Sequence, residues 1–201
     1  MSLVIVGGHS RNVGKTSVVA GLIAALPERD WTAVKITQYG HGVCSVNGES
    51  CGCAVDEHTF ALTEERDRAG RSDTSRFLAA GARRSLWVRT KQGRLAEAVP
   101  DLRREISGAA NVIVESNSVM KFLRPDLYLT VLDPATADFK ESAREFLDLA
   151  SALLLHAPAE AAPVWRDVSL KPAAGKPCFF IRPPQYVSGE LVEFVRARLQ
   201  G

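Results

Sequence analysis

The chain has 201 residues, of which 46% are apolar and 24% are charged, a balance typical of one soluble globular domain that needs no disulfides. Its net charge of +2 comes from 25 basic and 23 acidic residues, so the composition gives no general basic character for nucleic acid. No apolar run approaches the roughly 18 residues of a membrane span and residues 1–6 carry no basic leader, so we expect a cytoplasmic protein that binds neither membrane nor nucleic acid.

The first half of the chain alternates short apolar runs with segments of helical period. The strands and helices expected here occupy residues 3–6 (strand), 18–26 (helix), 32–36 (strand), 73–80 (helix), 86–88 (strand) and 100–108 (helix). The last helix is expected to start at Pro100, and Asp73 could cap the helix that it begins. Residues 39–65 hold three cysteines and four glycines without a clear period, and we interpret them as a Cys/His-rich loop insertion.

The second half keeps the same alternation. Strands are expected at 111–115, 127–132, 152–155 and 179–181, helices at 139–150 and 189–199, and a loop at 157–177. Cys178 lies next to the last strand and is expected in the buried core. Repeated strand–helix units predict a three-layer α/β fold with a mainly parallel sheet flanked by helices, built as one domain over residues 1–201.

The segment after the first strand predicts a phosphate-binding loop, or P-loop. It reads Gly-Gly-His-Ser-Arg-Asn-Val-Gly-Lys-Thr-Ser over residues 7–17, with five residues between Gly8 and Gly14 instead of the common four. Backbone amides would curl round phosphate, Lys15 would reach the terminal phosphates and the Thr16 hydroxyl would ligate Mg²⁺. The residues expected to bind ATP or GTP are Gly8, Asn12, Val13, Gly14, Lys15, Thr16, Ser17 and Lys35.

This spacing resembles the P-loop NTPase superfamily of dethiobiotin synthetase, the cobyrinic acid amidation enzymes, the chromosome-partition ATPases and the nickel-insertion GTPases. The partition ATPases carry a second lysine five residues before the motif lysine. That position is Ser10 here, so the chain does not resemble that subgroup.

Within the superfamily the chain is most similar to the molybdopterin-guanine dinucleotide biosynthesis adapter, protein B. Over residues 1–135 the similarity rests on Lys35 in the second strand, His41 after it, Ser72–Ser75 before Ala80–Ala82, and the strand that ends in Glu115. The resemblance implies an adapter in cofactor biosynthesis that binds Mg²⁺ and nucleotide, and works with a cofactor-biosynthesis or metalloenzyme protein. We also expect a homodimer.

Four side chains near the expected strand ends each have two interpretations. Glu115 is a candidate catalytic acid that organises Mg²⁺ or water, or an exposed strand end. Asp73 is a candidate Mg²⁺ ligand with a catalytic role or a helix cap, and Lys35 reaches phosphate or lies at a sheet edge. His156 follows a strand where the superfamily often contacts the base, but a lone histidine is more often incidental.

The loop at 39–65 carries a candidate second metal site. His41, Cys44, Cys51 and Cys53 form a set suited to tetrahedral Zn²⁺, and His58 could replace His41. The same thiols would suit an iron–sulfur centre, and the alternative is a flexible loop with reduced thiols.

These features lead us to expect one of three functions. The first is Mg²⁺-dependent binding and slow hydrolysis of ATP or GTP by an adapter. The alternatives are a metallochaperone NTPase that carries metal on its cysteines, and an ATP-dependent ligase that resembles dethiobiotin synthetase; a regulatory module with little turnover is also compatible. The sequence has no Asn-Lys-x-Asp motif to select guanine, so the nucleotide base stays open.

Overall fold

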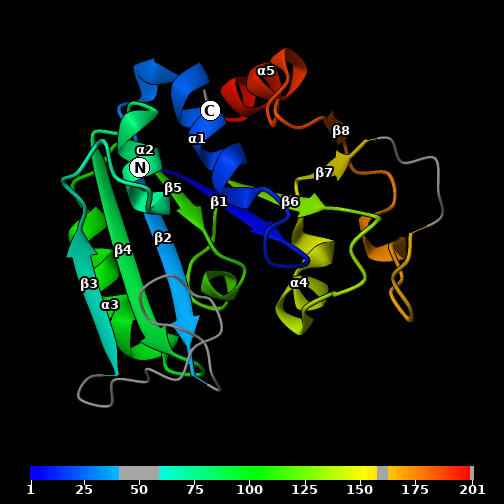
Figure 1. The fold of residues 1–201 in the computed structure, drawn as a ribbon, viewed down its shortest axis with the longest axis horizontal. Coiled ribbons are helices and arrows are strands. Elements are labelled where there is room, and N and C mark those ends of the chain that lie inside the picture. The colour runs from blue at the N-terminus through cyan, green and yellow to red at the C-terminus, as the bar shows by residue number, and fades with distance from the viewer. Residues whose placement is uncertain (41–58, 158–162, 200–201) are drawn as a thin grey trace.

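The computed structural model describes residues 1–40, 59–157 and 163–199. Within these ranges eight strands form one sheet, in the spatial order β3-β4-β2-β5-β1-β6-β7-β8 (Figure 1). The strands are β1 (Ser2–Gly8), β2 (Thr32–Tyr39), β3 (Phe60–Glu64), β4 (Arg84–Lys91), β5 (Asn111–Glu115), β6 (Leu127–Leu132), β7 (Ala152–His156) and β8 (Cys178–Ile181). All neighbouring pairs run parallel except β3 with β4.

Helices cover both faces of this sheet, which gives the three-layer α/β architecture expected from the alternating sequence. One apolar cluster packs α1 (Lys15–Ala25), α2 (Asp73–Ala79) and α5 (Gly189–Arg198) on one face. The other packs α3 (Leu95–Ile106) and α4 (Glu141–Glu145) on the opposite face. Short 3-10 helices connect them: η1 (Pro27–Arg29), η2 (Ser118–Lys121), η3 (Leu147–Leu149) and η4 (Lys171–Ala173).

The central strand β1 places the P-loop segment where strand order changes direction. β1 pairs with β5 on one side and β6 on the other, with Val6 opposite Glu115 and Leu129. Because both faces of a central parallel strand are covered, its sequence is a continuous apolar run. The chain leaving β1 therefore emerges at the carboxyl edge of the sheet, where such folds bind ligands.

Two expected element boundaries are wrong. The segment 39–65 is not loop throughout, because β3 pairs antiparallel with β4 at the sheet edge, with Phe60 opposite Thr90. None of its residues is fully buried, and its apolar run is only three residues long. Helix α3 begins at Leu95 and contains Pro100 in its interior. Burial of one apolar face from Leu95 to Ile106 outweighs the single backbone hydrogen bond that the proline cannot donate.

Three smaller expectations also need correction. The cap of α2 is Ser72, whose hydroxyl accepts from the Ser75 amide, while Asp73 is the first helical residue. The helix expected over 139–150 is broken near Phe146, where α4 ends and a 3-10 turn follows. Cys178 is exposed, because it begins the edge strand β8, which pairs only with β7.

Candidate functional site

The loop between β1 and α1 has the backbone geometry of an anion-binding turn. Asn12 and Gly14 both have left-handed φ angles, 57° and 90°, and such turns direct successive N–H groups into a concave surface. At Gly14 a Cβ atom would lie 2.2 Å from the Tyr186 ring. Glycine at this position therefore satisfies both the backbone angle and the close approach of the ring.

Asn117 anchors the start of this loop to the end of β5. Its amide donates to the Gly8 carbonyl at 2.8 Å, and its Oδ1 accepts from the Gly8 N–H at 2.9 Å. The buried Tyr128 hydroxyl donates to the same oxygen at 3.3 Å. The Gly8 amide is therefore engaged within the protein, and Asn117 is a site residue that was not predicted. The available signal was a polar residue two positions beyond the end of a buried apolar strand.

His9 links the loop to the segment that follows β6. The ring is fully buried; its Nε2 accepts from the Asp133 amide at 3.0 Å. Nδ1 therefore carries the proton and donates to the Asp138 carbonyl at 2.6 Å. Burial lowers the pKa of His9 below its usual value of 6.5, which favours the neutral ring that both hydrogen bonds require.

Lys15 extends along the inside of the loop. Its Nζ donates to the Ser10 carbonyl at 2.6 Å. Burial lowers the pKa of Lys15 to about 8, and the Glu115 carboxylate opposes that shift only in part. A phosphate group near Nζ would supply the negative charge that this ammonium lacks.

Glu115 joins the predicted site residues into one network. Its side chain is 3% exposed, and Oε2 accepts from the Thr16 hydroxyl at 2.8 Å. Its Oε1 lies 2.5 Å from Lys35 Nζ, and the same Nζ lies 2.7 Å from Asp73 Oδ2. Burial alone would lower the pKa of Lys35, but the two carboxylates outweigh it and raise that pKa. The structure thus brings together Thr16, Lys35, Asp73 and Glu115.

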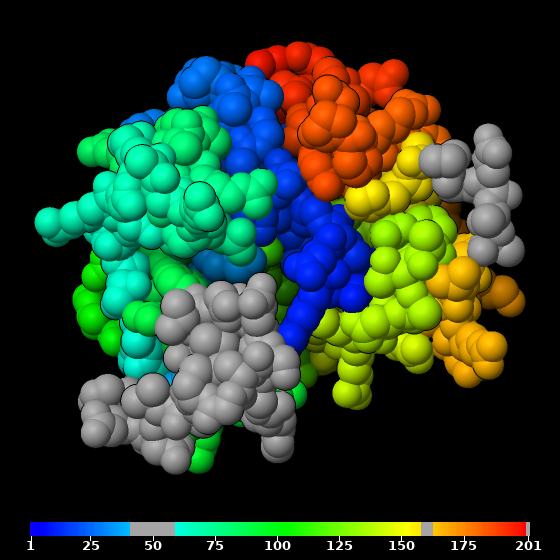
Figure 2. Space-filling view, viewed as in Figure 1, coloured from blue at the N-terminus to red at the C-terminus, as the bar shows by residue number. Residues whose placement is uncertain are grey.

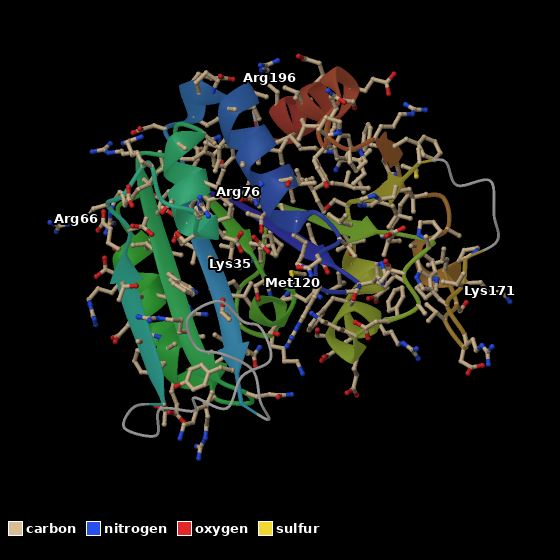
Figure 3. All side chains as sticks on the ribbon, in the orientation of Figure 1. Lys35, Arg66, Arg76, Met120, Lys171 and Arg196 are labelled. Atoms are coloured by element: carbon tan, nitrogen blue, oxygen red, sulfur yellow. The ribbon has the colours of Figure 1, made fainter. Side chains whose placement is uncertain are left out.

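Arg76 ties α2 to the first turn of α1. Its Nη2 donates to Ser17 Oγ at 3.0 Å, and its Nη1 lies 3.7 Å from Asp73 Oδ1. Figure 3 shows Arg76 and Lys35 together near the centre of the molecule, whereas Lys171 lies far to one side. Arg76 was not among the predicted site residues, because an arginine in a locally arginine-rich region has no distinguishing local pattern.

His156 contacts the P-loop segment from β7. Its Nε2 lies 2.9 Å from the Val13 carbonyl and donates a hydrogen bond to it. The Tyr186 ring lies edge-on to the imidazole, with centroids 6.1 Å apart. His156 therefore supports the loop backbone, a role that neither interpretation of the sequence, base contact or an incidental position, had given it.

Lys15, Arg76 and the Glu115 network line one broad cleft of about 1620 Å³, whereas His9 and His156 do not. Its lining comes from the loop and the first turn of α1, from β2, from the end of β5 and the residues after it, and from α2 and α4. Figure 2 shows the dark-blue segment after β1 in the middle of this face, with a hollow beside it. Six of the eight predicted nucleotide-binding residues, all but Gly8 and Val13, line this cavity, and they include Thr16, the predicted Mg²⁺ ligand.

The candidate cysteine site lies outside the described residues, with its expected ligands His41, Cys44, Cys51 and Cys53 and the alternative His58. In the ranges that are described, no group of three or more His, Cys, Asp or Glu side chains is arranged to hold a metal ion.

Among the described helices, none has the length and apolar character that a membrane-spanning helix needs.

The sheet order, the flanking helices and the loop after β1 together define the fold of a P-loop NTPase. No protein-family model and no curated protein matches the sequence.

Two solved structures show the likeness of fold. LpxK from Aquifex aeolicus, in complex with ATP, is 18% identical with a TM-score of 0.50, over 90% of this chain and 53% of LpxK. HypB from Helicobacter pylori, in complex with nickel, is 14% identical with a TM-score of 0.50, over 98% of this chain and 86% of HypB. The chain therefore spans about half the length of LpxK, and at these identities the likeness concerns the fold.

Proposed function

We propose that the protein binds ATP or GTP together with Mg²⁺ and hydrolyses the nucleotide slowly. The observation that carries the proposal is the network from Thr16 through Glu115 to Lys35, in which Glu115 ends β5 and lies opposite Lys35 of the parallel strand β2. In P-loop proteins these are the positions at which Mg²⁺ and the β- and γ-phosphates are held.

The donor set fits Mg²⁺ bound through one hydroxyl, phosphate oxygens and water. Thr16 would supply the hydroxyl oxygen. Glu115, which accepts a hydrogen bond from this hydroxyl, would orient the hydroxyl toward the metal ion. Lys15 would contact the terminal phosphates, and the amides at the start of α1 would add the favourable end of the helix dipole. When bound, Mg²⁺ would neutralise charge on the β- and γ-phosphates.

Slow hydrolysis follows from how Glu115 is bonded. One carboxylate oxygen accepts from Thr16 and the other is paired with Lys35. A general base must have a lone pair directed at the attacking water. Glu115 is therefore better suited to orient the Mg²⁺ ligand than to remove a proton from water quickly.

Calorimetric titration with MgATP and MgGTP tests nucleotide binding. The Lys15→Ala variant should lose measurable affinity for both, because the loop then lacks the cation nearest the terminal phosphates. Lys171→Ala is the matched control, since Lys171 is an exposed lysine in η4, away from the cleft (Figure 3). Unchanged affinity in Lys15→Ala, or no binding by the wild type, would contradict the proposal.

We place this NTPase in cofactor biosynthesis, as an adapter in the cytoplasm that acts as a homodimer, on the resemblance to protein B. The second candidate is a metallochaperone NTPase, which the cysteine cluster supports. Native mass spectrometry of protein purified without chelator would separate them. Nucleotide without metal on a dimer supports the adapter, and a stoichiometric thiophilic metal supports the metallochaperone.

A further inference from the structure

The segment after β6 presents Lys140 at the mouth of the P-loop. Residues 133–140 run from the end of β6 to α4 and contact the loop repeatedly. Ser10 Oγ donates to Asp138 Oδ2 at 2.7 Å, and the Lys140 amide donates to the His9 carbonyl at 2.8 Å. The Lys140 carbonyl accepts two further bonds from the first turn of α4. The backbone of Lys140 is thus fixed beside the loop before any ligand binds.

The charge of Lys140 has no carboxylate partner within salt-bridge distance in the described part of the chain. Its side chain is half-buried and lines the cleft. Burial lowers the pKa of Lys140, the neighbouring charge of Arg11 lowers it further, and Asp138 opposes the shift only in part. Arg11 also lines the cleft and has no salt bridge among the same residues.

Two of the other three lysines that line the cleft differ from Lys140 in this respect, whereas Lys15, among the described residues, bonds only the Ser10 carbonyl. Lys35 is paired with two carboxylates, and Lys121 is paired with Glu145 at 2.9 Å. Lys140 also acts on Lys15, whose pKa its charge helps to lower. The positive charges of Lys140, Arg11 and Lys15 repel one another in the cleft, and this repulsion destabilises the unliganded protein. A bound anion would remove that repulsion, so the arrangement favours a multiply charged ligand.

We propose that Lys140 and Arg11 form an oxyanion subsite that binds a phosphate group at the mouth of the P-loop. This inference rests on the proposed nucleotide binding. The phosphate is either the terminal phosphate of the nucleotide or that of a second ligand. The cleft of about 1620 Å³ exceeds the roughly 300–1,000 Å³ of a typical small-molecule site, so it has room for both.

The first experiment measures affinity for ADP and GDP and for their β,γ-imido triphosphates, with Mg²⁺. If the subsite binds the nucleotide's own phosphate, Lys140→Met weakens triphosphate binding roughly 10- to 100-fold and leaves diphosphate binding nearly unchanged. Lys140→Arg restores most of the affinity. Lys121→Met is the matched control, because that lysine lines the same cleft but is already paired.

The second experiment adds inorganic phosphate to protein saturated with the imido triphosphate. If the subsite takes a second ligand, phosphate binds the wild type but not Lys140→Met or Arg11→Met, and triphosphate affinity is the same in all three. If neither titration responds to these two substitutions while the diphosphate still binds, the subsite is refuted and the nucleotide-binding proposal stands. A wild type that binds no nucleotide refutes both.

Thermal melting separates a ligand-binding role from a structural one. Removing an unpaired, half-buried charge should leave the melting temperature of ligand-free Lys140→Met equal to or above that of the wild type. With the ligand that binds the subsite present, the wild type should melt at the higher temperature. A ligand-free variant that melts clearly below the wild type would show that Lys140 stabilises the fold, and would overturn the proposal.

Discussion

Glu115 is bonded both to Thr16 in the first turn of α1 and to Lys35, which in turn pairs with Asp73 in α2. Its carboxylate is buried, and both oxygens are occupied by groups that also face the cleft. Removing one partner of a buried ion pair costs several kcal/mol when the other charge is left alone. Here Lys35 keeps its contact with Asp73, so substitution at 115 should perturb the site more than the fold.

Glu115→Gln should reduce nucleotide hydrolysis by about 10²-fold while changing affinity much less. The amide can still accept from Thr16, but it no longer supplies the negative charge that orients the Mg²⁺ ligand. Steady-state turnover and calorimetric affinity should be measured on the same preparations. Asp73→Asn is the comparison variant, because it leaves the Lys35–Glu115 pair in place. Hydrolysis at the wild-type rate in Glu115→Gln would remove this residue from the mechanism.

Lys15 should make nucleotide affinity depend on pH. In the free protein burial lowers its pKa to about 8, and bound phosphates should raise that pKa because they stabilise the ammonium. Affinity should therefore be highest below pH 8, weaken as pH rises through 8, and be accompanied by proton uptake. Lys140, whose pKa burial also lowers, acts in the same direction.

Calorimetric titrations from pH 7.5 to about 9.5 in two buffers of different ionisation enthalpy check this proton uptake. The terminal phosphate of the nucleotide is already ionised over this range, so the protein supplies the signal. Lys15→Arg keeps its charge throughout and should lack this part of the decline. An affinity that is flat with pH in the wild type would contradict the assignment.

At the scale of elements, the P-loop depends on what the neighbouring strands supply. Asn117 follows β5, the segment that holds His9 follows β6, and His156 ends β7. Asn117 and His156 bond backbone groups of the loop, whereas His9 is held through its side chain. The loop is therefore shaped by three strand ends that are distant in sequence, in addition to its own glycines.

Asn117→Ala should destabilise the protein by about 2 kcal/mol, since it leaves the buried Gly8 N–H without its partner, and should weaken nucleotide binding. Asn111→Ala is a matched control at the opposite end of β5, where the side chain makes one hydrogen bond to the Arg29 carbonyl. It should lower stability without changing nucleotide affinity. Denaturant unfolding and titration check both variants, and equal losses of affinity in the two would refute a specific role for Asn117.

At the scale of the whole molecule, the two apolar layers are complete within the described residues. One packs α1, α2 and α5 on the sheet and the other packs α3 and α4. Because these layers form the core around the sheet, we predict that the stability of this core does not depend on metal at the candidate cysteine site.

We predict that His41, Cys44, Cys51 and Cys53 bind about one Zn²⁺ or related ion per chain, with affinity that weakens as pH falls because the thiols must lose protons. Metal analysis should show the ion in the wild type and its loss in a Cys51→Ser, Cys53→Ser double variant. Cys178→Ser is the control, because that exposed cysteine lies in β8. Chelation should leave the unfolding midpoint of the nucleotide domain unchanged. No metal in the wild type, even after added Zn²⁺ or anaerobic iron and sulfide, would refute the site.

The sequence by itself determined the features that have local signals. The continuous apolar runs predicted β5 and β6 with the bounds that the structure shows, because a strand buried on both faces admits few polar residues. The glycine, lysine and threonine at 14–16 predicted the loop before α1, since that spacing encodes a turn and a helix start. Lys35, Asp73 and Glu115 were selected as strand-end and helix-start residues, and the structure joins them.

Only the tertiary structure decided the features that depend on distant partners. The edge strand β3 forms because β4 offers unpaired backbone groups, which residues 60–64 alone do not reveal. Contacts between the segments that follow β1, β5 and β6 fix the positions of Asn117, His9 and Lys140. The sequence shows which chemical group a polar side chain carries. Its burial and its charge partners depend on segments that are distant in sequence and come into contact with it only in the folded chain.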